Sequence, residues 1–76
     1  MEDKVDIYLI KKFEKILKEK ISLNDEIRHL NIDSIIFFDF IFQVEKDFSI
    51  KIDFSELNNI KTLNDFGLLI KSKLNK

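Results

Sequence analysis

The sequence predicts an all-α fold, a small four-helix bundle with three main helices and one short helix. Apolar residues recur at helical spacing in three segments, and the chain contains no proline. Residues 49–54 alternate loosely like a strand, but a lone strand has no partner in 76 residues, so we expect a loop there. A chain this short buries only about 60% of its unfolded surface, which predicts a single domain, residues 1–76, with one modest core.

The first helix is expected from Asp6 to Lys20. Its apolar positions have the spacing of an amphipathic helix, with lysine and glutamate in the gaps. These positions are Leu9, Ile10, Phe13, Ile16 and Leu17. The next stretch, from Ser22 to Ile32, opens with turn-forming residues and has no sustained period, so we expect a connecting loop.

Asp33 marks the start of the second helix, which we expect from Ser34 to Phe48. Aspartate is a favoured N-cap because its carboxylate accepts a hydrogen bond from a free N–H group of the first turn. At about 100° per residue, four apolar side chains share the direction expected to face the core. They are Phe37, Ile41, Val44 and Phe48, whereas Phe40 and Ile36 point in other directions.

A second apolar stripe of this helix comprises Ile35, Phe38 and Phe42, flanked by Asp39 and Glu45. Two interpretations are open. A small bundle can surround a helix that is apolar on nearly all sides. Alternatively, the stripe and its carboxylates form an exposed patch at which another protein docks.

Two further segments complete the bundle. The stretch from Ser55 to Ile60 predicts a short helix of one or two turns, with Ser55 as its cap. Thr62 to Asp65 resembles a capping box in which aspartate takes the usual place of glutamate or glutamine. The last helix follows, and its apolar stripe is Leu63, Phe66, Ile70 and Leu74.

The composition excludes several classes of protein. The chain has no cysteine and a single histidine, His29, so a disulfide framework, a catalytic triad and a transition-metal site all lack components. The longest uninterrupted apolar run, residues 35–38, is far short of the roughly 20 residues that span a bilayer, and no signal-peptide stretch is present. We therefore expect a soluble cytoplasmic protein with no metal site and no membrane partner.

The charges are unevenly distributed along the chain. The formal net charge is −1, but residues 25–56 contain eight acids and three bases, which gives −5. Nucleic-acid binders usually present a basic stripe, so we expect no nucleic acid partner. A basic protein surface suits this acidic segment better.

One motif at the second helix carries functional information. Leu30-Asn31-Ile32-Asp33 precedes Ser34-Ile35, and here the sequence resembles the acyl carrier protein family, whose signature is Leu-Gly-x-Asp-Ser-Leu. The resemblance continues without a gap to about Ile70. Asn31 replaces the glycine of the motif, and asparagine is the best other residue for a left-handed backbone.

The resemblance implies that Ser34 carries 4′-phosphopantetheine, attached from coenzyme A by a separate phosphopantetheinyl transferase. It also implies that Asp33 caps the helix and helps the transferase assemble its metal-bound phosphate site. A helix N-terminus favours a phosphate anion through its free N–H groups and partial positive charge. The thiol of the group then carries acyl, aminoacyl or aryl intermediates as thioesters, so the chain is expected to be a substrate of enzymes and not an enzyme.

The same resemblance implies that the second stripe and its carboxylates contact partner enzymes. These residues are Ile35, Phe38, Asp39, Phe42 and Glu45. The implied partners are the transferase, a ligase that loads acyl or aminoacyl groups, and a downstream synthase or transferase, with the chain itself a free-standing monomer.

Ile36 and Lys46 stand where fatty-acid carriers usually have acids, so we expect a dedicated carrier in a specialised biosynthetic pathway. The alternative is an unmodified helical module that binds a partner protein through the stripe of Ile35, Phe38 and Phe42.

Overall fold

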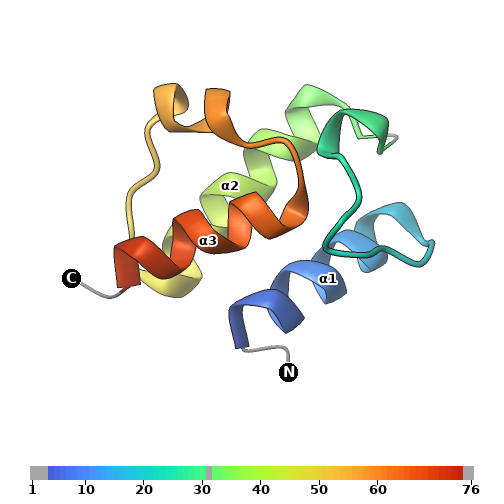
Figure 1. Cartoon of the computed structure of the whole chain (residues 1–76), viewed down its shortest axis with the longest axis horizontal. Coiled ribbons are helices and arrows are strands. Elements are labelled where there is room, and N and C mark those ends of the chain that lie inside the picture. Colours follow the sequence, from blue (N-terminus) through green and yellow to red (C-terminus); the bar gives the residue numbers. More distant parts are fainter. Residues whose placement is uncertain (1–3, 31, 75–76) are drawn as a thin grey trace.

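Figure 1 shows a computed structural model of the chain, in which residues 4–30 and 32–74 are described. The elements, in order, are α1 (Lys4–Leu17), η1 (Ile27–His29), α2 (Ser34–Phe48), η2 (Phe54–Asn59) and α3 (Leu63–Leu74). The helices α1, α2 and α3 and the short 3-10 helix η2 confirm the predicted all-α bundle. The 3-10 helix η1 lies within the expected first loop and was not predicted. The expectation for Asn31 falls outside the described residues.

The first helix begins and ends earlier than predicted. It spans Lys4–Leu17, so the expected end at Lys20 is wrong. Lys18 adopts a left-handed backbone conformation with a φ of 59°, and its N–H donates to the carbonyl of Glu14 at 2.7 Å. The Glu14 carboxylate also accepts a hydrogen bond from the backbone N–H of Ile21 at 3.1 Å, which turns the chain out of the helix.

The second helix has the predicted bounds. Asp33 is its N-cap, and Oδ1 of this residue accepts a hydrogen bond from the N–H of Ile36 at 2.9 Å. The helix ends at Phe48, and the backbone of the next residue, Ser49, is left-handed. The predicted loop follows, and it is held to α2 by Glu45, whose Oε2 accepts from the N–H of Ile52 at 2.8 Å.

The caps of the last two elements differ in how well they were predicted. Ser55 lies inside η2 and is not its cap; Asp53 precedes the helix, and its N–H donates to Oε1 of Glu56 at 2.9 Å. The capping box of α3 is confirmed. The N–H of Asp65 donates to Oγ1 of Thr62, and the N–H of Thr62 donates to Oδ2 of Asp65, both at 3.2 Å.

Backbone hydrogen bonds join the first loop to the segment before α3. The N–H of Ile27 donates to the carbonyl of Lys61 at 2.8 Å, and the N–H of Asn64 donates to the carbonyl of Leu23 at 2.9 Å. Glu26 and Thr62 form an isolated antiparallel bridge between these bonds. These contacts fix η1 beside the chain that leaves η2 (Figure 1).

All three α-helices contribute to one core. Its buried apolar residues are Val5, Leu9, Phe13, Ile21, Phe40, Ile41, Val44, Ile52, Leu63, Phe66 and Ile70. Phe40 is central, since its ring centroid lies 4.5 Å from that of Phe13 in α1 and 5.7 Å from that of Phe66 in α3. The expectation that Phe40 points away from the core is therefore wrong. Because α2 packs against two helices, its buried side is wider than one stripe.

Three expected core positions lie at the edge of this packing. Leu74, at the end of α3, is 43% exposed and does not extend the buried stripe of that helix. Phe37 and Phe48 are only half-buried. The ring of Phe48 meets that of Tyr8 edge to face, 4.9 Å between centroids, and the Tyr8 hydroxyl donates to Oδ2 of Asp47 at 2.6 Å. This contact joins α1 to the end of α2.

Candidate functional site

Ser34 is the first residue of α2 and its side chain is exposed. Asp33 precedes it in an extended conformation, and the Asp33 cap occupies the N–H of Ile36. The N–H groups of Ser34 and Ile35 have no carbonyl partner within the helix, because the first N–H groups of an α-helix are unpaired by geometry. Together with the positive end of the helix dipole, they favour an anionic group beside the hydroxyl.

The second stripe of α2 is exposed. Ile35 is 79% exposed, Phe42 is 64% exposed and Phe38 is 42% exposed. The interpretation in which the bundle surrounds α2 on all sides is therefore wrong. Neighbouring apolar side chains on a surface are typical of sites at which another molecule binds.

A residue of η2 enlarges this surface. Phe54 is 65% exposed, and its ring meets that of Phe38 edge to face with centroids 5.3 Å apart. We call Ile35, Phe38, Phe42 and Phe54 together the exposed apolar face. The sequence did not point to Phe54, because the contact depends on how the loop after α2 returns to that helix.

The predicted carboxylates of this region have different environments. Asp33 and Asp39 are exposed, and Oδ2 of Asp39 accepts from the side-chain amide of Gln43 at 2.9 Å. Oε1 of Gln43 in turn accepts from Nζ of Lys12 at 3.1 Å, which links α1 to Asp39. Glu45 is half-buried and binds the backbone of Ile52. It supports the loop that leads to η2 instead of lying with the exposed carboxylates.

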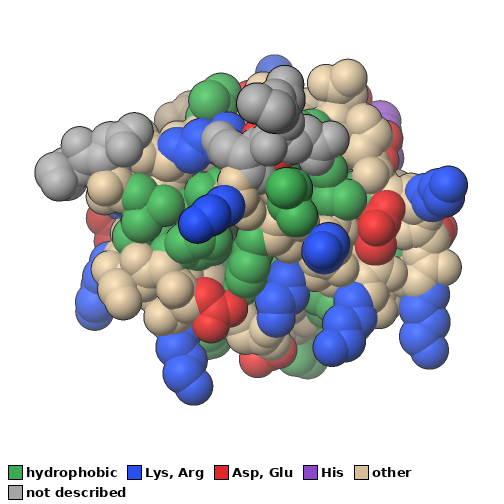
Figure 2. Space-filling view, turned by 90° about the horizontal axis from the view of Figure 1, so that it is seen from below, with side chains coloured by type: hydrophobic (Ala, Val, Ile, Leu, Met, Phe, Trp, Pro, Cys, Tyr) green, Lys and Arg blue, Asp and Glu red, His purple; other side chains and the backbone are tan. Residues whose placement is uncertain are grey.

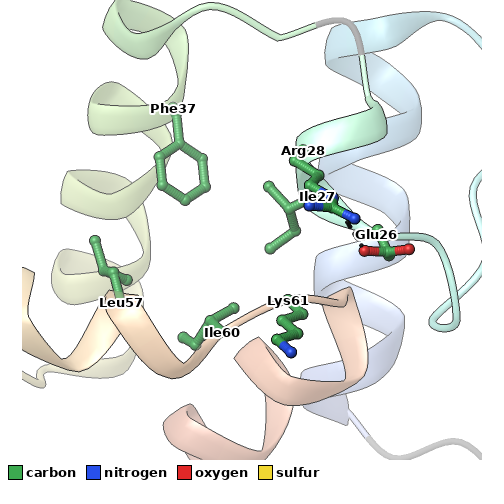
Figure 3. A pocket seen from close by; sticks show the side chains of 7 residues that line it. All are labelled: Glu26, Ile27, Arg28, Phe37, Leu57, Ile60 and Lys61. Atoms are coloured by element: carbon green, nitrogen blue, oxygen red, sulfur yellow. Dashed lines mark ion pairs between the residues drawn. The ribbon is translucent and has the colours of Figure 1, made fainter.

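A pocket of about 310 Å³ lies between α2, η1 and the segment that includes η2 (Figure 3). Its apolar lining consists of Ile27, Phe37, Leu57 and Ile60, and its polar lining consists of Glu26, Arg28 and Lys61. Nε of Arg28 pairs with Oε1 of Glu26 at 3.2 Å at the rim. Phe37 lies one helical turn after Ser34, so the pocket opens close to the start of α2.

In residues 4–30 and 32–74, no group of three or more histidine, cysteine, aspartate or glutamate side chains is arranged to hold a metal ion. Over the same residues, no helix is both long enough and apolar enough to cross a bilayer.

Ser34 is an exposed serine at a helix start, and Ile35 of the exposed apolar face follows it directly. Comparisons with known proteins identify the family to which the chain belongs. A family model described as a phosphopantetheine attachment site matches residues 8–70. The chain is 38% identical over 66 residues to an acyl carrier protein homolog of Mycoplasma genitalium, which covers 87% of this chain and 77% of that protein.

Two more similarities extend the comparison. An acyl carrier protein homolog of Mycoplasmopsis pulmonis is 33% identical over 66 residues, covering 87% of this chain and 90% of that protein. A crystal structure of an acyl carrier protein from Thermotoga maritima shares the fold, with a TM-score of 0.74 and 23% identity, covering 99% of this chain and 96% of that one. The chain belongs to the acyl carrier protein family.

Family membership defines the cofactor and the general role. The cofactor is 4′-phosphopantetheine, which is attached covalently. Carriers of this family are not enzymes themselves; phosphopantetheinyl transferases and acyl-handling enzymes act on them.

Proposed function

We propose that Ser34 is the residue that receives 4′-phosphopantetheine and that residues 1–76 form a single carrier domain. The observation that carries this proposal is the exposed hydroxyl-bearing residue at the first position of α2, directly after the Asp33 cap. An exposed side chain can enter the active site of a transferase without unfolding of the helix.

The surroundings of Ser34 fit a phosphodiester. The free N–H groups at the start of α2 can donate to phosphate oxygens, and the partial positive charge of the helix end favours the anion. When attached, the group supplies a thiol for cargo, and this chain has no cysteine of its own. Asp33 keeps the first turn in place, so the backbone of Ser34 is held at the start of α2.

The exposed apolar face is proposed to dock partner enzymes, with Ile35, Phe38, Asp39 and Phe42 in contact. Apolar side chains slow dissociation, while exposed carboxylates increase the rate of encounter with a basic partner. Phe54 belongs to the same surface because it packs on Phe38. Glu45 acts indirectly, through its hydrogen bond to the loop before η2.

The pocket beside α2 is proposed to shelter part of an apolar cargo. Ile27, Phe37, Leu57 and Ile60 provide its apolar walls, and its volume of about 310 Å³ suits a small group. Such a pocket keeps a short acyl or aryl chain partly out of water while the carrier diffuses between a loading ligase and a downstream synthase or transferase.

A specialised biosynthetic pathway remains our proposal for the source of the cargo. Ile36 is 39% exposed and Lys46 is exposed, so the surface of α2 has an apolar and a basic side chain where general fatty-acid carriers usually have acids. Those side chains favour partner enzymes whose surfaces are less basic than the surfaces that suit an all-acidic helix.

Intact-mass measurement after incubation with coenzyme A and a broad-specificity phosphopantetheinyl transferase tests the proposal. We expect a mass increase of one phosphopantetheine in the native chain and in Ser55→Ala, which alters another exposed serine at a helix start. Ser34→Ala should remain unmodified. An unchanged mass of the native chain with several transferases would contradict the proposal and favour the alternative, an unmodified module that binds proteins through Ile35, Phe38 and Phe42.

A further inference from the structure

The exposed side of α1 carries lysines and no carboxylate. The exposed residues of this helix are Lys4, Ile7, Lys11 and Lys15, of which Ile7 is 41% exposed. The three lysines are separated by seven and four residues, about two turns and one turn, so they lie along one side of the helix. This side faces away from the core.

The two carboxylates of α1 are engaged elsewhere. Asp6 is buried, and its Oδ1 lies 3.1 Å from Nζ of Lys71 in α3. Oε2 of Glu14 accepts the hydrogen bond from the backbone of Ile21. The positive charge along the exposed side is therefore not neutralised by acids of the same helix.

The turn after α1 extends this charge. Lys18 and Lys20 are exposed there, with Glu19 as the exposed acid between them. Figure 2 looks at the molecule from below, the side on which α1 lies in Figure 1. It shows several lysine or arginine side chains projecting along this face, with fewer aspartate or glutamate side chains between them. We call the set Lys4, Lys11, Lys15, Lys18 and Lys20 the lysine face.

We infer that the lysine face binds the surface of an anionic lipid bilayer. Basic clusters of about this size are attracted to the negative potential of anionic leaflets, and each lysine close to the surface raises the affinity about fivefold. Binding is therefore weak and reversible, and it depends on salt. The inference rests on the charges of α1 and is independent of the modification of Ser34.

The chemistry of the face favours a bilayer over a protein surface. Ile7 is the exposed apolar residue of α1, whereas protein interfaces usually have an apolar or aromatic centre. The pocket described above is lined by residues outside α1. Lysine, a compact charge on a flexible stem, suits a diffuse anionic surface, while arginine, which recognises fixed carboxylates, does not occur in α1.

The geometry leaves the carrier site accessible on a bilayer. With α1 against the headgroups, the exposed Ile7 is on the side of the helix toward the lipid. The start of α2 lies toward the opposite, upper side of Figure 1. Ser34 then faces the solvent. The inference goes beyond the expectation of no membrane partner, which was based on the lack of a spanning segment.

Vesicle flotation of the full chain tests the inference. We expect binding to phosphatidylcholine vesicles that contain about one-third phosphatidylglycerol, none to phosphatidylcholine alone, and release at about 1 M salt, where the Debye length is only about 3 Å. Replacing Lys4, Lys11 and Lys15 together with glutamine should reduce binding at least about tenfold. The matched variant replaces Lys46, Lys51 and Lys61, exposed lysines outside α1, and should retain binding.

Three outcomes would overturn the inference. They are no binding to anionic vesicles at low salt, an equal loss in both triple variants, and tighter binding to a soluble poly-glutamate than to the vesicles. An equal loss would show a response to net charge alone, and tighter poly-glutamate binding would identify an acidic protein surface as the occupant.

A site-resolved readout distinguishes contact of α1 from nonspecific adsorption. The chain has no tryptophan, so Ile7→Trp introduces a single tryptophan, which can be excited selectively, on the lysine side of α1. Its emission should shift to the blue with anionic vesicles. Leu68→Trp, at a 54% exposed position of α3, should not shift. Equal shifts in the two variants, or a shift in Leu68→Trp alone, would contradict docking through α1.

Discussion

The rings of Phe38 in α2 and Phe54 in η2 meet edge to face, with centroids 5.3 Å apart, and both side chains remain substantially exposed. The contact joins two consecutive elements, separated by residues 49–53, into one apolar surface. Exposed aromatic residues add little to a folded core, but they are common anchors in protein interfaces. Partner recognition is therefore proposed to depend on η2 as well as on α2.

We predict that Phe54→Ala slows modification by a phosphopantetheinyl transferase. Loss of one aromatic anchor costs about 1–2 kcal/mol of binding, which corresponds to roughly a tenfold lower kcat/KM. The free energy of unfolding should change by less than about 1 kcal/mol, because Phe54 is mostly exposed. Initial rates of mass increase at low carrier concentration measure the first effect, and urea denaturation measures the second.

Leu68→Ala is the matched control for Phe54→Ala, since Leu68 is an apolar residue of α3 that is 54% exposed and lies outside the exposed apolar face. It should be modified at the native rate. Equal modification rates for Phe54→Ala and the native chain would contradict the proposal that η2 is part of the docking surface.

Asp33 is predicted to have two separable roles, which are to cap α2 and to serve the transferase through its carboxylate. Asp33→Ala removes the cap on the N–H of Ile36 and should lower the free energy of unfolding by about 1 kcal/mol. Asp33→Asn retains a side chain that can cap, so its stability should be close to native. If the carboxylate itself serves the transferase, Asp33→Asn will still be modified more slowly than the native chain. A native rate in Asp33→Asn would limit the residue to capping.

Phe40 and Phe42 provide a direct comparison of buried and exposed aromatic residues on one helix. Phe40 is 1% exposed and Phe42 is 64% exposed. We predict that Phe40→Leu lowers the free energy of unfolding by about 1–2 kcal/mol through poorer packing, while Phe42→Leu changes it by less than about 0.5 kcal/mol. Urea midpoints of the two variants check the contrast, and equal midpoints would be incompatible with this core.

Local signals predicted the starts of two helices. The carboxylate of Asp33 and the pair Thr62 and Asp65 form their caps with atoms only three residues away in sequence, so the pattern alone is informative. The exposed stripe of α2 was also found from periodicity. Periodicity could not decide whether the stripe was covered, because that depends on where the other helices lie.

The burial of Phe40 and the pocket near α2 depend on contacts between distant parts of the chain, so the sequence did not predict them. Phe40 is buried because Phe13 and Phe66 approach it from two other helices, and a helix with apolar residues on most sides gives no local sign of this. The pocket near α2 requires η1, whose position depends on the hydrogen bond from Ile27 to Lys61. Neither partner of that bond has a distinctive local pattern.

Tyr8 predicts a change of stability at high pH. Burial, followed by the hydrogen bond to Asp47, raises the pKa of Tyr8 above its usual range in the folded chain. The resulting stabilisation is fully present below the unfolded pKa of about 10 and is lost as the pH rises through the folded value. When the pH is raised from below 10 to above 10, the urea midpoint of Tyr8→Phe should therefore fall less than that of the native chain. Parallel decreases in the two proteins would argue against this role of Tyr8.

The identity of the modified residue tests the central claim most directly. Trypsin cleaves after Arg28 and Lys46, which releases a peptide, residues 29–46, in which Ser34 is the sole hydroxyl-bearing side chain. After incubation with coenzyme A and a transferase, tandem mass spectrometry of this peptide should place phosphopantetheine on Ser34. Detection of the group on any other peptide, with residues 29–46 unmodified, would contradict the assignment of Ser34 as the attachment residue.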